Sequence, residues 1–124
     1  MVLPQESIVA ALRSLLGPSD LEVLTGAYAE FVVDSTRVGI GPQDGGWFDD
    51  DIVFVRPWGF ELESIRVPAL CLQGEQDRFV PYGHGVWLSE HIPGVEPWLT
   101  PEDGHLTLFV RRVPEVHAWL LERY

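Results

Sequence analysis

The chain has 124 residues, enough for one domain with one hydrophobic core and too few for two ordinary domains. Hydrophobic residues make up 46% of it, with five Trp and six Phe, so its composition excludes an intrinsically disordered chain. A net charge of −11 excludes nucleic acid and anionic membrane surfaces as partners, because both would repel the chain.

The N-terminus has neither the basic region nor the continuous apolar stretch of a secretory signal, and no apolar run is long enough to span a membrane. The single cysteine, Cys71, lies inside an apolar run. It cannot form a disulfide within the chain, and we expect it to pack as a small hydrophobic residue. These features predict a cytoplasmic protein that does not contact a membrane.

The first third of the chain predicts two helices joined by a short Gly-Pro turn. Residues 4–16 carry apolar side chains at helical spacing, with Pro4 suited to the first turn and Gly17 suited to end the helix. A second helix is expected from Ser19, where Ser-Asp-Leu-Glu matches a capping box, to about Val38.

An acidic segment follows, with the sequence GIGPQDGGWFDDD, and its Gly, Pro and Asp content predicts a loop. Clustered aspartates can bind a hard cation, but the spacing lacks the alternating ligands and terminal Glu of a calcium loop. We therefore favour a solvated acidic turn that caps a short helix ending before Pro57. Neither a metal site nor a cofactor is predicted. The acids concerned are Asp44, Asp49, Asp50 and Asp51.

A change of pattern near residue 66 indicates a βαβ unit. Residues 67–72 show no polar alternation, which is typical of a strand buried on both faces of a parallel sheet. Residues 83–91 predict a helix, and residues 95–100 predict a second strand in spite of Pro97. An amphipathic C-terminal helix should follow, with Pro114 as a point where it could break.

Asp77 follows the first predicted strand, and His105 follows the second. Because the carboxyl ends of parallel strands meet at one edge of a sheet, these side chains should lie together there. A carboxylate can accept one ring N–H of a histidine, fix its tautomer and stabilise the imidazolium. We expect Gly74 and Gly104 to let the two loops turn tightly.

The segments IRVPALCLQGEQDRFVP and HIPGVEPWLTPEDGHLTL resemble the C-terminal part of an α/β-hydrolase. In that family a strand ends in a Gly-x-x-Asp loop that carries the triad acid, and the next ends in a Gly-His loop that carries the base. The resemblance covers residues 65–124 and implies that Asp77 is the acid and His105 the base. Residues 1–60 resemble the family's helical cap and link more loosely. The implied architecture is a partial α/β-hydrolase fold in which residues 61–124 form a short parallel sheet and a C-terminal helix.

The family's nucleophile elbow, Gly-x-Ser-x-Gly, does not occur in this sequence, and neither does its oxyanion-hole loop. The resemblance therefore implies a serine hydrolase for an ester, amide or similar bond of a small molecule, present as its acid and base half and inactive alone. A non-catalytic binding or interaction protein on the same scaffold is the alternative. Because two parallel strands form a marginal sheet, we expect a second copy or an N-terminal half to complete it.

Overall fold

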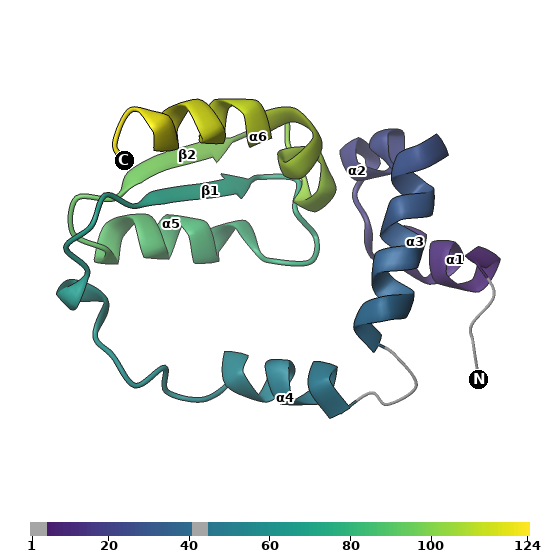
Figure 1. Cartoon of the computed structure of the whole chain (residues 1–124), viewed down its shortest axis with the longest axis horizontal. Coiled ribbons are helices and arrows are strands. Elements are labelled where there is room, and N and C mark those ends of the chain that lie inside the picture. Colours follow the sequence, from purple (N-terminus) through teal and green to yellow (C-terminus); the bar gives the residue numbers. More distant parts are fainter. Residues whose placement is uncertain (1–4, 41–44) are drawn as a thin grey trace.

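The computed structural model describes residues 5–40 and 45–124, with side chains for 10–39 and 45–124. In chain order the elements are α1 (Gln5–Leu15), α2 (Pro18–Val23), α3 (Gly26–Ile40), α4 (Gly45–Phe54), a 3₁₀ turn (Leu62–Ser64), β1 (Leu70–Gly74), α5 (Tyr82–His91), β2 (Glu96–Thr100) and α6 (His105–Leu121). They form a mixed α/β arrangement in which α5 and α6 pack on a small sheet, α1, α2 and α3 lie to one side of that unit, and α4 lies apart from it (Figure 1).

The sheet consists of β1 and β2 in parallel, with Leu70 opposite Glu96 and Gly74 opposite Thr100. Helix α5 covers one face and α6 the other (Figure 1), so the predicted βαβ unit and C-terminal helix are confirmed. Within the described part of the chain no third strand joins this sheet. The first strand begins three residues later than predicted, after Pro68, which has no N–H to donate to a ladder.

Pro97 is accommodated in β2 because of the side to which its nitrogen points. The Glu96 N–H donates to the Ala69 carbonyl, and the groups that face a neighbouring strand alternate along a parallel ladder. The Pro97 nitrogen therefore faces away from β1, at the outer edge of the sheet, where a missing N–H costs no ladder bond. By the same alternation the main-chain groups of Leu70 and Leu72 face the outer edge of β1.

The N-terminal helices depart from the prediction at two points. The expected helix over 19–38 is two helices, because α2 ends at Val23 and Gly26 begins α3 with a φ of +53°, a left-handed conformation that glycine adopts readily. The predicted capping box is also wrong, since Gly17 is the N-cap residue of α2 and Pro18 opens the helix. The Ser19 hydroxyl is buried without a hydrogen-bond partner among the described residues.

The predicted acidic loop is wrong for residues 45–51, which lie in α4. Its two glycines fall in the first turn, and the residues after them include no helix breaker before Pro57, so a helix can form. Asp49, Asp50 and Asp51 are exposed on this helix, and Asp44 lies outside the described residues. No residue of α4 is buried.

Helix α6 runs through Pro114 without a break, so the expected interruption there does not occur. Pro114 removes the hydrogen bond that its own nitrogen would have made, but the C-terminal half stays docked on the sheet. The indole N–H of buried Trp119 donates to Glu96 at 2.7 Å, and the Arg123 guanidinium reaches the same carboxylate at 2.8 Å. Glu96 thereby ties the end of α6 to the start of β2.

Among the described side chains, few apolar ones are buried: Leu16, Leu24, Val33 and Trp119 form this set. The chain exposes 8632 Å², whereas a compact monomer of 14.0 kDa is expected to expose about 6,700 Å². The chain thus presents more surface than an independently folded domain of its mass. Within the described ranges, no helix combines the length and the apolar composition that crossing a membrane requires.

Candidate active site

Asp77 is held by the loop that carries it. Its Oδ1 accepts the main-chain N–H groups of Phe79 at 2.8 Å and Val80 at 2.9 Å, the pattern of a carboxylate that closes its own turn. The buried Gln73 amide, at the end of β1, donates to Oδ2 at 3.3 Å. With 3% of its side chain exposed, the carboxylate is immobilised in one orientation.

His105 is the first residue of α6, and its Nδ1 lies 3.0 Å from Oδ2 of Asp77. The structure therefore brings together the two residues that the sequence placed at successive strand ends. An ionised carboxylate can only accept, so this contact places the ring proton on Nδ1 and leaves Nε2 with its lone pair. The side chain is 35% exposed, and no hydrogen bond from the described residues reaches Nε2.

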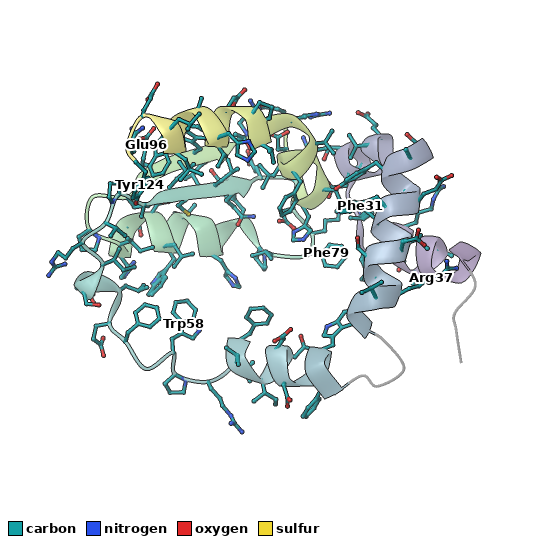
Figure 2. The ribbon with its side chains drawn as sticks, in the orientation of Figure 1. Phe31, Arg37, Trp58, Phe79, Glu96 and Tyr124 are labelled. Atoms are coloured by element: carbon teal, nitrogen blue, oxygen red, sulfur yellow. The ribbon has the colours of Figure 1, made fainter. Side chains whose placement is uncertain are left out.

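Two aromatic rings flank the imidazole. The ring centroid of Phe79 lies 5.0 Å from that of His105, and the ring of Phe109, one turn later on α6, lies 6.3 Å away in an edge-on arrangement. Both phenylalanines are largely exposed. Figure 2 shows Phe79 projecting from the loop after β1 towards α3. The exposed side of the imidazole is therefore bordered by apolar surface.

The two loops that carry Asp77 and His105 are joined through main-chain contacts. The Glu75 N–H donates to the Thr100 carbonyl at 2.8 Å, and the Gln76 N–H donates to the Asp103 carbonyl at 3.0 Å. A Cβ atom on Gly74 would lie 2.1 Å from the Asp103 oxygen. Gly74 does not have a positive φ, so this close approach, rather than the tight turn expected, is what requires glycine there.

Asp103 anchors the loop before His105. Its fully buried carboxylate accepts from Arg112 Nε at 2.7 Å and from Arg111 at 3.2 Å. Burial raises the pKa of Asp103, but the hydrogen bonds from Arg112, Thr100 and Arg111, together with the charge of Arg112, outweigh it and hold that pKa below its ordinary value. The ion pairs of Asp103 with Arg111 and Arg112 thus fix the loop against the N-terminal half of α6.

Asp20 is a site residue that the sequence pattern did not reveal. It lies in α2, yet its carboxylate accepts the main-chain N–H groups of His105, Leu106 and Thr107. The predicted capping box gave roles to Ser19 and Glu22 alone, and no signal in the sequence links Asp20 to a helix 85 positions later.

The side chains described contain no nucleophile in contact with His105. The hydroxyls of Ser14, Ser64 and Ser89 donate to nearby main-chain carbonyls on their own helices or turns. The Cys71 thiol points to the Gly85 carbonyl between β1 and α5, which fits the packing role expected for it. Among the described residues the site is thus a carboxylate–imidazole dyad.

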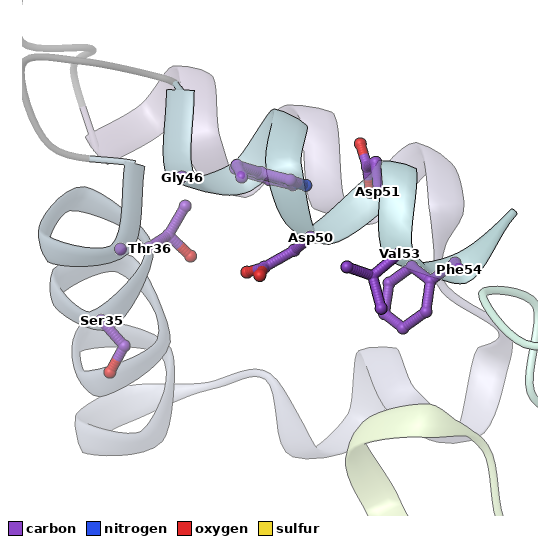
Figure 3. Close-up of a pocket in the computed structure, with 9 residues that line it drawn as sticks. Ser35, Thr36, Gly46, Asp50, Asp51, Val53 and Phe54 are labelled. Carbon is purple, nitrogen blue, oxygen red and sulfur yellow. The ribbon is translucent and has the colours of Figure 1, made fainter. Parts of the chain in front are cut away.

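Two surface concavities lie away from the dyad. One, of about 620 Å³, lies between α3 and α4 and is bordered by Thr36, Trp47 and Phe54 (Figure 3). Another, of about 650 Å³, runs along the segment after α4 to Trp87 and His91 on α5. Neither includes Asp77 or His105. In the described ranges no group of three or more His, Cys, Asp or Glu side chains is placed to hold a metal ion.

Comparison of the chain with known protein families, curated proteins and solved structures finds no match.

Proposed function

We propose that Asp77 and His105 are the acid and the base of a serine hydrolase site of the α/β-hydrolase type, acting on an ester, amide or similar bond. One observation supports this proposal above others: the His105 imidazole donates to a buried carboxylate that two main-chain N–H groups already hold in place. This arrangement suits a base whose second nitrogen must take and return a proton.

In the proposed reaction Nε2 of His105 removes the proton from a serine hydroxyl as its oxygen forms a bond to the substrate carbonyl carbon. The imidazolium that results is stabilised by Asp77, because the Nδ1–H hydrogen bond becomes charge-assisted. The same proton is then returned to the leaving group as the scissile bond breaks. Water attacks the acyl group in the second half of the cycle, with His105 again as base.

The serine comes from outside this sequence, on a strand-to-helix elbow that joins the sheet beside β1. The outer edge of β1 supports this placement, since the main-chain groups of Leu70 and Leu72 face it and no described strand pairs there. On the family pattern, such a strand would bring its elbow to the carboxyl edge of the sheet, where His105 lies. The chain alone is then expected to lack serine hydrolase activity.

The aromatic rings beside the imidazole favour a substrate with an apolar acyl or ring group. Phe79 and Phe109 both contact the His105 ring and keep much of their surface exposed. Bound substrate would cover this surface and displace water from the reacting bond. Neither phenylalanine carries a group that would select one bond type over another.

The dyad can be tested without its serine, because an imidazole paired with a carboxylate can still assist the slow hydrolysis of p-nitrophenyl acetate. We expect His105→Ala to remove this activity and Asp77→Asn to lower it, because the imidazole then loses the carboxylate that fixes its tautomer and stabilises the imidazolium. His117→Ala is the matched control, since His117 is an exposed histidine on the same helix.

Equal hydrolysis by wild type and His105→Ala would contradict the assignment of the base. A fluorophosphonate probe tests the other half of the proposal: the chain should not be labelled, and covalent labelling of a serine within it would overturn the proposal of a serine supplied from outside.

A second candidate function is a non-catalytic interaction protein on the same scaffold. The observation that favours it is the apolar surface at the end of α4 and in the segment after it, where Phe54, Val55, Trp58 and Phe60 are all exposed. Trp58 and Phe60 stack on each other with ring centroids 6.0 Å apart, and Figure 2 shows Trp58 in this outlying segment. A second copy of the chain is the partner that such a surface would serve in this function.

A further inference from the structure

Asp20 caps a helix to which it is not adjacent in sequence. Its Oδ2 accepts the N–H of His105 at 2.9 Å, while Oδ1 accepts the N–H groups of Leu106 at 2.8 Å and Thr107 at 3.0 Å. The Thr107 hydroxyl also donates to Oδ1, at 3.3 Å. One carboxylate from α2 therefore satisfies the first three N–H groups of α6, which a helix cannot satisfy internally.

Gly104 leaves the space that this carboxylate fills. It is the N-cap residue of α6, the position where Ser, Thr, Asp or Asn ordinarily supplies the capping oxygen. A Cβ atom on Gly104 would lie 2.5 Å from Oδ2 of Asp20. Its φ is −107°, so close approach, rather than the tight turn expected from the sequence, explains the glycine. The helix thus takes its cap from a distant segment instead of from its own N-cap residue.

The electrostatic setting makes this contact strong. Asp20 is fully buried, and no cationic side chain among the described residues forms an ion pair with it. A buried carboxylate needs compensation, which here comes from the N–H groups and the positive end of the 17-residue helix α6. Loss of these contacts would leave the Asp20 carboxylate buried without compensation and the first N–H groups of α6 without acceptors.

His105 is consequently held twice, by two parts of the chain. Its main-chain N–H is bound by Asp20 of α2, and its ring Nδ1 is bound by Asp77 of the loop after β1. As the first residue of α6 it lies where helices fray, so the position of its Cα depends on the cap. The two carboxylates together determine where the imidazole is and which way it faces.

We infer that Asp20 is a positioning residue for His105, through which the helical segment controls the alignment of the imidazole with Asp77. The catalytic consequence of this inference rests on the proposed function, whereas the geometric part does not. Removal of the Asp20 cap releases the first turn of α6, and the ring then loses its fixed hydrogen bond to Asp77 even though Asp77 itself is unchanged.

The ring nitrogens of His105 in the full chain provide the test. In a long-range ¹H–¹⁵N spectrum, the wild-type ring should give the pattern of a single tautomer with the proton on Nδ1. In Asp20→Ala this pattern should be lost in favour of averaged tautomers, while circular dichroism still shows a folded helical chain. A folded Asp20→Ala chain with an unchanged His105 pattern would show that Asp20 supports only stability and would overturn the inference.

Three further variants keep the test decisive if Asp20→Ala does not fold. Asp20→Asn preserves shape and the acceptor for Leu106 and Thr107 but sets an NH₂ group against the His105 N–H, so it should disturb the His105 ring in an intact fold. Asp20→Ala combined with Gly104→Ser supplies a local cap in the vacated space and should restore the wild-type pattern. Gly104→Ser alone should disturb it, because its Cβ meets Asp20.

Hydrolysis of p-nitrophenyl acetate separates the two proposals. If Asp20→Ala alters the ring pattern and wild type shows no hydrolysis dependent on His105, the positioning role stands and the proposed function fails. If wild type shows that hydrolysis and Asp20→Ala retains all of it with an unchanged ring pattern, the proposed function stands and the positioning role fails.

Discussion

A Cβ atom on Gly74 would lie 2.1 Å from the main-chain carbonyl oxygen of Asp103, so the last residue of β1 touches the loop that follows β2 at a position that has no side chain. This contact fixes the separation of the two loops, and Asp77 and His105 lie three and two residues beyond it. The alignment of the dyad therefore depends on a main-chain contact as well as on its own hydrogen bond.

Gly74→Ala should push these two loops apart. We expect the free energy of unfolding to fall by about 1–3 kcal/mol, the usual cost of overpacking, and the His105 ring to lose its single-tautomer pattern. Urea denaturation and the long-range ¹H–¹⁵N spectrum are the measurements. Gly83→Ala is the control, because no atom lies within 4 Å of its Cβ position in α5 and alanine favours a helix. An unchanged free energy of unfolding in Gly74→Ala would contradict the close contact between Gly74 and the Asp103 carbonyl oxygen.

Acidification should weaken the anchor at Asp103. Because its pKa is lowered in the folded chain, Asp103 contributes stability that is fully present above its unfolded-state pKa and is lost as the pH falls through the lower folded value. The unfolding free energy of wild type should thus exceed that of Asp103→Asn at pH 7, by about 1–3 kcal/mol for a lost buried partner. This difference should shrink below about pH 4, as urea denaturation at several pH values would measure. A difference that stays constant from pH 7 to pH 3 would argue against the pairing with Arg112.

Protonation of Glu96 should give a spectroscopic signal at low pH. Hydrogen bonds from the indoles of Trp119 and Trp98, aided by Arg123, hold its pKa below the ordinary value against the opposing effect of burial. Its contribution to stability is therefore present above the unfolded-state pKa and lost as the pH falls through the folded value. The indole N–H resonances of Trp98 and Trp119 should shift with a midpoint below the usual glutamate range, and Glu96→Gln should abolish that step.

The indole of Trp87 serves as the reference for this titration, because it lies on α5 and stacks on His91 instead. A step at Trp87 with the same midpoint as at Trp98 and Trp119 would indicate general acid unfolding rather than protonation of Glu96.

The excess of exposed surface predicts self-association. The chain exposes about 1,900 Å² more than a compact monomer of its mass would, and one partner in a standard interface buries about 800 Å². We expect sedimentation velocity to show species heavier than 14.0 kDa that dissociate on dilution. Val55→Glu should favour the monomer without loss of stability, because Val55 is exposed. A compact monomer at every concentration would contradict this expectation and the second candidate function.

The sequence determined the order and kind of the elements that carry the dyad. The apolar run at residues 67–72 indicated a parallel strand, although β1 is only partly buried, and the positions of Asp77 and His105 after two predicted strands placed both at one sheet edge. The same local reasoning failed at α4 and at Gly26, since local composition does not say whether a glycine falls in a first turn or between two helices.

Only the tertiary structure decided what holds the dyad in place. Asp20 only lies between Ser19 and Glu22 of the predicted capping box, yet it caps a helix 85 residues away. Gly74 and Gly104 are required by atoms of other segments rather than by their own φ angles. Caps and close approaches of this kind depend on which segments the fold packs together. A pattern within one segment cannot encode the position of another, so such contacts become visible only once both are placed in space.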